Sequence, residues 1–273
     1  MRKIVVSLIA ALAIFPNDVF SQNGSNSEGR LVAANYVISF SQIFLGKTIR
    51  GQNLGRSFVR SLYEAVPATA MQYAGMKMVG RNWRLALPAQ LLVQKGAALE
   101  RRSILGEPVL SRELLTSWDL DYLWFNLRIR NGRVLAPRLN VVTTVATVTN
   151  LNARLDLGYS LTTGVVFFSH SREVPDDAGG IYIFGTIHTA SVGEGYNELV
   201  SHELIHRFQD IREGVLPEVF LKQDRERGWP VSLLRLDFSL SYPNYWLQKR
   251  LNPHCYGCRF YEWEAGAYSG NRW

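Results

Sequence analysis

The segment from His202 to His206 constrains this chain more than any other, because it reads His-Glu-Leu-Ile-His. On an α-helix, residues four positions apart lie on one face, so the two imidazoles can point at one ion. Glu203 would then lie beside a water on that ion, where a carboxylate can accept a proton. The spacing therefore predicts a helix that presents two metal ligands and a general base.

The flanking residues predict the bounds of this helix. It would run from about Glu198 to about Arg212, with Asn197 as its N-cap and Gly214 as its stop. Its apolar positions recur at helical spacing and would form the buried face: Leu199, Val200, Leu204, Ile205, Phe208 and Ile211. The rest of the helix circumference carries the polar residues, as a buried metal site requires: His202, Glu203, His206 and Asp210. The alternative is a surface helix whose histidines and Glu203 are solvated.

A catalytic metal site of this type needs a third protein ligand, and segment 260–269 is the best candidate. Its sequence is Phe-Tyr-Glu-Trp-Glu-Ala-Gly-Ala-Tyr-Ser. The aromatic residues indicate that the segment packs, and a buried carboxylate is costly without a partner such as a cation. Glu262 is the first choice of ligand and Glu264 the second. The alternative is an exposed acidic helix that binds nothing.

Together the two segments resemble the zincin metallopeptidases, in particular the gluzincins, where a Glu on a second helix completes the ligand set. Segment 260–269 is similar to the pattern E-x-x-A-[DN]-x-[FY]-[AS] of membrane-associated prenyl-protein and heat-shock zinc endopeptidases, with Glu262 as the ligand and Ala265 under the first helix. Gly266 departs from this pattern, because those families have Asp or Asn there. The acid that orients a ligating His is therefore unassigned, and Asp210 could serve instead.

This resemblance implies a zinc-dependent peptidase that hydrolyses peptide bonds of a peptide or protein substrate. His202, His206 and Glu262 would hold Zn²⁺, with a water in the fourth position and Glu203 as its general base. Such peptidases usually have a further hydrogen-bond donor to the oxyanion. The sequence offers three candidates without ranking them: Tyr268, His188 and Tyr256.

Two other functions are compatible with the same residues. One is a catalytically eroded, peptidase-derived envelope protein that binds a partner or a membrane surface. Gly266 favours it, and the intact Glu203 opposes it, because a binding protein has little need for a base. The other is a helical membrane-associating protein with a chance motif, which predicts no bound metal.

The start of the chain predicts export. Residues 1–21 have a basic beginning, an apolar run too short to span a bilayer, and Ser21 before a possible cleavage site. They are expected to be a signal peptide, with an uncleaved anchor as the alternative, and residues 22–29 a flexible polar leader. The protein would act in the periplasm or cell envelope of a bacterium, or be secreted.

The chain has two cysteines, Cys255 and Cys258. In an exported protein, a C-x-x-C pair most simply forms a short-range disulfide, which would brace the turn ahead of Glu262. A small structural metal site that also uses His254 is the alternative.

Residues 30–105 are the basic part of the chain, with 11 Lys or Arg and 2 Asp or Glu. They predict apolar helices, with glycines such as Gly75 and Gly80 at a junction: 31–45, 54–79 and 83–99. Apolar helices that carry Arg and Lys suit peripheral contact with an anionic membrane surface. A helical subdomain with a solvated basic face is the alternative. Nucleic acid is not expected to be a partner of an exported protein, despite a pI near 9.5.

Residues 117–170 predict an antiparallel β-meander. Four runs rich in β-formers carry this prediction: 120–129, 140–148, 153–159 and 165–168. Asn131-Gly132 follows the first run and is a strong hairpin signal.

A further strand is expected over 181–188, just before the motif helix. In the zincins, which this order resembles, the edge strand of the sheet borders the cleft and pairs with extended peptide substrate. The irregular stretch 214–259 would form a wall or lid over the cleft. The expected fold is therefore α+β, with the basic helical part over 30–105, then the meander and a zincin-like core over 106–273.

Overall fold

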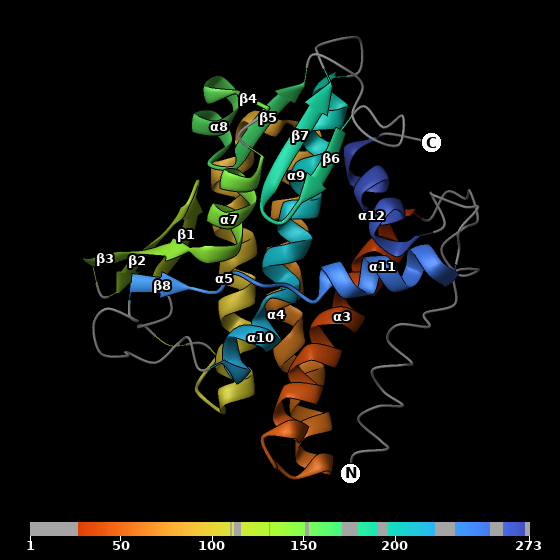
Figure 1. The fold of residues 1–273 in the computed structure, drawn as a ribbon. Coiled ribbons are helices and arrows are strands. Elements are labelled where there is room, and N and C mark those ends of the chain that lie inside the picture. The colour runs from red at the N-terminus through yellow and green to blue at the C-terminus, as the bar shows by residue number, and fades with distance from the viewer. Residues whose placement is uncertain are drawn as a thin grey trace.

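The computed structural model describes most of the chain, in these ranges: 27–109, 111, 116–130, 132–150, 153–170, 180–190, 196–221, 233–251 and 259–270. The predicted signal peptide, the C-x-x-C pair with His254, and the oxyanion candidate Tyr256 lie outside the described residues. The predicted α+β class is confirmed, because long helices accompany two separate sheets (Figure 1).

The basic part is helical, as predicted. It forms α3 (Ser27–Ile49), α4 (Leu54–Arg81), the short 3-10 helix η1 (Trp83–Leu85) and α5 (Ala86–Leu105). The side chain of Asn53 caps α4 by accepting a hydrogen bond from the amide of Arg56, and Gly106 ends α5 with a φ of 80°. None of the described helices combines the length and apolar character needed to cross a bilayer.

The prediction that Gly75 and Gly80 mark a helix junction is wrong, because both lie inside α4. A Cβ on Gly75 would come within 2.6 Å of Val93 Cγ2 on α5. A Cβ on Gly80 would lie 2.7 Å from the carbonyl carbon of Tyr268 on α12 (Phe260–Ser269). These glycines therefore permit close helix crossing rather than a change of chain direction.

The first sheet contains β1 (Trp118–Tyr122), β2 (Phe125–Arg130), β3 (Arg133–Asn140) and β8 (Leu234–Arg235), in that order. The first three strands are antiparallel, and β8 is parallel to β3. The predicted turn after β2 is confirmed, because Arg130 pairs with Arg133 and Gly132 has a φ of 76°. The run 120–129 is two strands rather than one, because Leu123 turns the chain with a φ of 54°.

One predicted strand is a helix, and another is a strand only in part. Run 140–148 forms α7 (Val141–Thr149), where the carboxylate of Asp237 accepts the amides of Val142 and Thr143 at 2.7 and 3.1 Å. This distant acid satisfies free amides at the helix start, and so outweighs the β-propensity of Val and Thr. Run 153–159 is divided between a short strand, Arg154–Leu155, and the first turn of α8 (Leu157–Thr163), which Asp156 caps.

The second sheet has the order β4 (Arg154–Leu155), β5 (Val166–His170), β7 (Thr186–Ala190) and β6 (Gly180–Ile183). Strands β5 and β7 are parallel. The prediction of one antiparallel meander over 117–170 is wrong, because its strands divide between the two sheets and helices α7 and α8 interrupt them. The predicted strand 181–188 is a hairpin, turned by Phe184 and Gly185 with φ of 46° and 85°. Its first strand, β6, is the edge of this sheet.

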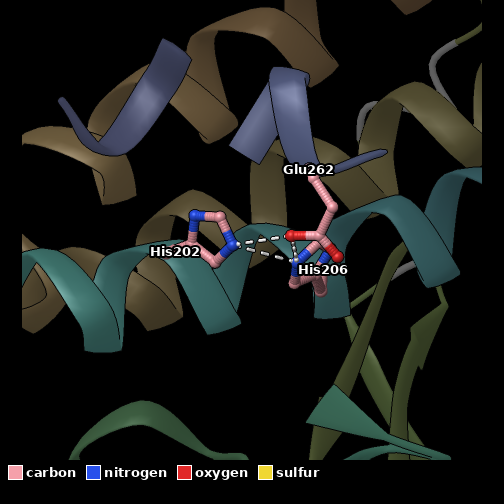
Figure 2. Close-up of side chains that lie close together, drawn as sticks. All are labelled: His202, His206 and Glu262. Carbon is pink, nitrogen blue, oxygen red and sulfur yellow. Dashed lines mark hydrogen bonds and ion pairs between the residues drawn. The ribbon is translucent and has the colours of Figure 1, made fainter. Parts of the chain in front are cut away.

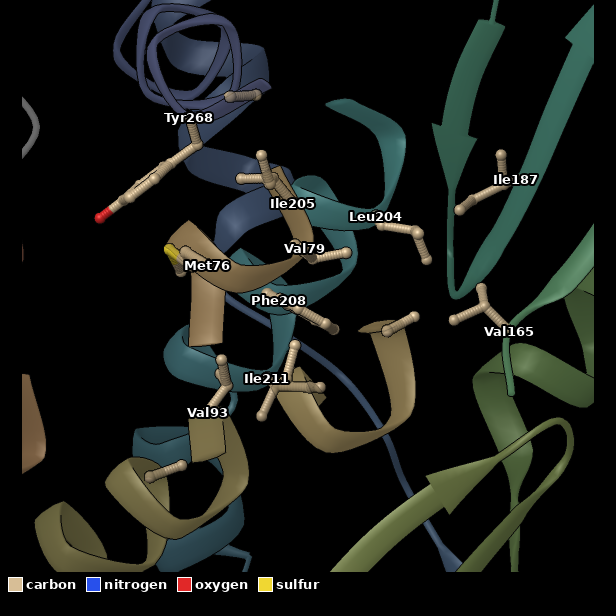
Figure 3. Packing of buried hydrophobic residues seen from close by; sticks show 14 of the residues in the cluster. Met76, Val79, Val93, Val165, Ile187, Leu204, Ile205, Phe208, Ile211 and Tyr268 are labelled. Atoms are coloured by element: carbon tan, nitrogen blue, oxygen red, sulfur yellow. The ribbon is translucent and has the colours of Figure 1, made fainter. Parts of the chain in front are cut away.

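The core forms around α9 (Tyr196–Glu213), which runs through the middle of the molecule (Figure 1). Four of its predicted apolar residues are completely buried: Val200, Leu204, Ile205 and Phe208. They share one hydrophobic cluster with α4, α5 and the second sheet, shown in Figure 3 by Met76, Val79, Val93, Val165 and Ile187. The described part of the predicted lid forms α10 (Val215–Phe220), β8 and α11 (Ser241–Leu251), and α11 contacts both α9 and α12.

Candidate metal centre

The two motif histidines project from one face of α9. The Nε2 atoms of His202 and His206 are 3.2 Å apart, and their rings are nearly perpendicular. The helix begins at Tyr196, one residue before the predicted cap, so the prediction of Asn197 as N-cap is wrong. That side chain lies in the first turn and accepts a hydrogen bond from the Trp83 indole at 2.8 Å. Gly214 follows the last helical residue, as predicted.

Glu262 lies in the first turn of α12 and points at both imidazoles (Figure 2). Its Oε2 is 3.2 Å from His202 Nε2 and 3.4 Å from His206 Nε2. The three potential ligand atoms all lie within 4.8 Å of one another. The structure therefore brings together the two histidines and the acid that the sequence places 56 residues or more downstream.

Side chains from two neighbouring helices position the turn that carries Glu262. The side-chain oxygen Oε1 of Gln248 on α11 accepts a hydrogen bond from the backbone amide of Phe260 at 2.8 Å, and the side chain of Asn244 donates to the Tyr261 hydroxyl at 2.9 Å. From α9, Gln209 donates to the carbonyl of Tyr261 at 3.1 Å. The ligand turn is thus fixed from both sides.

Glu264, the second choice of ligand, lies elsewhere. Residues two apart on a helix point in nearly opposite directions, and Glu264 faces Arg212 instead of the histidines. Its two oxygens are 2.8 and 2.9 Å from the guanidinium nitrogens, and it also accepts from Asn35 and Gln209, both at 2.9 Å. This carboxylate is saturated by hydrogen bonds to protein.

Glu203 is buried beside the histidines and Glu262. Gly180 on β6 lies against it: a Cβ there would be 3.2 Å from Glu203 Oε1. Among the described residues, no group forms a hydrogen bond with Glu203 Oε2. Burial raises the pKa of Glu203 to about 8, although the charge of His206 opposes this. An acid with a raised pKa and a free oxygen is suited to exchange protons with a small molecule at the centre.

The three potential ligands form a site that attracts positive charge. Burial lowers the pKa of His202, and so favours the neutral imidazole that ligates metals. Burial also disfavours charge on His206, but Glu262 outweighs it and raises the pKa of His206 to about 9. The pKa of Glu262 is held well below its ordinary range by the two imidazoles, despite its burial. Two imidazole nitrogens and one carboxylate oxygen are a donor set typical of zinc.

The residue that orients a histidine is Gln209 rather than Asp210. The side-chain oxygen of Gln209 lies 2.7 Å from Nδ1 of His206. Asp210 accepts hydrogen bonds from the hydroxyls of Tyr182 and Ser241, and contacts neither imidazole. Gln209 lies three residues after His206, on the same side of the helix. This spacing could have been used to predict the contact from the sequence.

The oxyanion candidates within the described residues are hydrogen-bonded to groups outside the centre. The Tyr268 hydroxyl accepts from Asn35 at 3.0 Å, and His188 is hydrogen-bonded to His170 and Thr186.

Sequence analysis missed Tyr245 on α11. Burial raises its pKa, and the charges of Glu262 and Glu203 raise it further, so its hydroxyl lies within the field of both carboxylates. Arg259 donates to that hydroxyl at 3.2 Å. No local pattern marked Tyr245, because the packing of α11 against α9 and α12 brings it there.

Comparison with known proteins found no family model, no curated protein and no solved structure that matches this chain.

Proposed function

We propose that this protein is a zinc-dependent metallopeptidase. One observation carries the proposal: the ligand atoms of His202, His206 and Glu262 lie within 4.8 Å of one another, beside the buried carboxylate of Glu203. In the proposed function, the three residues hold Zn²⁺ and the position facing Glu203 remains open to water. A structural zinc site would have a fourth protein ligand instead.

The chemistry divides between the ion and Glu203. When bound, Zn²⁺ would act as a Lewis acid on the scissile carbonyl and lower the pKa of a water ligand. Glu203 takes a proton from the attacking water and delivers it to the leaving amine nitrogen. The burial that raises its pKa favours the protonated form after the first transfer.

The substrate is proposed to be an extended peptide. Strand β6 has one partner among the described strands, β7, and it contacts α9 near Glu203. A peptide that adds to the free edge of β6 would use main-chain hydrogen bonds, which need no particular side chains. Gly180 leaves the space next to Glu203 without a side chain.

Metal analysis and a protein digest test this function. The wild type is expected to contain about one zinc per chain, and Glu262→Ala to contain little, because two imidazoles alone hold zinc weakly. Glu203→Gln is expected to keep its zinc and to lose hydrolysis of casein. If Glu203→Gln hydrolysed casein at the wild-type rate, the proposed mechanism would be wrong.

The same experiment separates the peptidase from a peptidase-derived binding protein. Gly266 and the absence of an acid behind His206 in the described residues favour the binding protein. Such a protein would contain zinc but would not digest casein even as the wild type. A chain with a chance motif would contain no zinc.

A further inference from the structure

The first half of α4 is inverted relative to an ordinary surface helix. An ordinary helix buries its apolar face and exposes its polar one. Here the inward-facing residues include three polar ones: Ser57, Ser61 and Glu64. The outward-facing residues are large and apolar: Leu54, Phe58, Val59, Leu62, Tyr63 and Val66. Val59, Tyr63 and Val66 are 59, 57 and 54% exposed, so most of their surface faces solvent.

The buried polar side chains beneath this helix form hydrogen bonds and ion pairs with α3 and α5. Glu64 accepts from the ammonium of Lys47, a completely buried residue of α3, and from the hydroxyl of Ser103 on α5. Farther along, Gln72 donates to Glu100 at 2.9 Å. Because these groups hold α3, α4 and α5 together, turning α4 over to bury its apolar side would break buried ion pairs.

The apolar surface continues from α4 onto α3. The ring of Phe58 makes edge-to-face contacts with Phe40 and Phe44, with centroids 5.4 and 5.8 Å apart. We call this continuous surface the α3–α4 face, defined by six residues: Phe40, Phe44, Phe58, Val59, Tyr63 and Val66. Along α4, from Phe58 to Val66, it extends about 12 Å, at 1.5 Å per residue.

The charged side chains that α4 and the α3–α4 turn expose have one sign. Arg50 and Arg56 are exposed at the α3–α4 turn, and Arg60 is partly exposed. Between residues 29 and 106 the sequence has two acids, Glu64 and Glu100, and both are buried. No carboxylate of α4 or of this turn reaches solvent, so the face would attract a surface that combines apolar groups with negative charge.

We propose that the α3–α4 face docks on an anionic lipid bilayer, with its apolar side chains among the acyl chains and Arg50 and Arg56 at the level of the phosphates. A helix that lies in the interface buries an apolar side of this kind and keeps cations at the headgroups. This docking does not depend on the metal centre.

Vesicle flotation tests the docking with the full-length chain. The wild type is expected to float with vesicles of phosphatidylcholine and phosphatidylglycerol. Val59→Ser, Tyr63→Ser and Val66→Ser combined are expected to lower its partition by about tenfold or more, from the apolar area lost. The matched control is Val145→Ser with Val148→Ser, because both valines are 57% exposed, on α7. This control should float like the wild type.

The arginines are tested separately. Arg50→Gln with Arg56→Gln is expected to lower partition onto the anionic vesicles by about tenfold or more, at about 1 kcal/mol per cation. Partition onto pure phosphatidylcholine should be unchanged. A wild type that binds neither vesicle, or an equal loss in the α7 control, would overturn the docking.

A spin label identifies what covers the face. Val59→Cys and Val145→Cys are labelled in chains in which Cys255 and Cys258 are replaced by Ser. On anionic vesicles, the label at residue 59 should gain oxygen accessibility and lose contact with a water-soluble nickel reagent, and the label at 145 should change little. A label at 59 that is already shielded without vesicles, by a second copy or by residues 1–26, would contradict the proposal.

Discussion

The guanidinium of Arg212 forms a two-point ion pair with Glu264, with nitrogen–oxygen distances of 2.8 and 2.9 Å. Both residues are completely buried, and the pair joins the motif helix α9 to α12, two residues from Glu262. The acid nearest in sequence to the proposed ligand thus fixes the helix that carries it.

Glu264→Ala is therefore expected to destabilise the fold. It would leave a buried guanidinium without its two-point partner and with Glu213 at 3.5 Å, which costs up to about 3–5 kcal/mol of the free energy of unfolding. Urea unfolding without added metal measures this cost. The matched control is Glu262→Ala, whose imidazole partners can lose their charge by deprotonation, so its cost should be smaller. Equal losses in the two variants would refute this difference in role.

Gly80→Ala is expected to lower the free energy of unfolding by about 1–3 kcal/mol, because its Cβ would overlap the backbone of Tyr268. The helix α12 would have to move, so zinc affinity should fall together with stability. Gly55→Ala is the matched control within α4, because its Cβ would meet only Asn53, at 3.6 Å. That change should be neutral or slightly stabilising, as Ala favours helix. Thermal unfolding and zinc titration of both variants check the comparison.

Glu100 is expected to make the protein less stable as the pH rises. Burial raises the pKa of Glu100 from 4.5 to about 7, although a hydrogen bond from Gln72 opposes this. The unfolded chain therefore releases this proton at a lower pH than the folded chain. Its contribution to stability is full below about pH 4.5 and falls by about 3 kcal/mol as the pH rises to about 7.

Glu100→Gln removes that titration. Relative to the wild type, the variant should gain stability between pH 5 and pH 8, measured by urea unfolding at each pH. Glu107→Gln, at an exposed site beyond the end of α5, is the control and should follow the wild-type profile. A constant difference between Glu100→Gln and the wild type across this range would contradict the role of Glu100.

Local patterns predicted the elements that carry the site. The i, i+4 spacing of His202 and His206 and the apolar period of α9 are properties of one helix, so they can be read without the rest of the chain. The segment around Glu262 was found in the same way, as was the helical character of residues 30–105. The sequence pattern of α4 did not predict which of its residues face inward. Its polar side is buried because Lys47 and Ser103, on other helices, pair with Glu64.

Features that depend on distant residues were missed. The helix α7 owes its start to Asp237, which lies more than 90 residues away in sequence. Glu262 was already the first choice of ligand, but no local pattern indicated that Glu264 pairs with Arg212, which lies 52 residues away in sequence. Tyr245 comes near the centre through the packing of α11, which no local spacing indicates.

Gln209 is expected to set the zinc affinity of the proposed centre. Its side-chain oxygen holds Nδ1 of His206 at 2.7 Å, and its amide donates to Glu264 and to the carbonyl of Tyr261. Gln209→Ala keeps all three proposed ligands but frees the His206 ring, so zinc affinity should fall by about 10–100-fold. Competition with a chromophoric chelator measures this change. Glu198→Ala, an exposed change on the same helix, is the control and should bind zinc like the wild type. If Gln209→Ala bound zinc as tightly as this control, the orientation of His206 would not depend on Gln209.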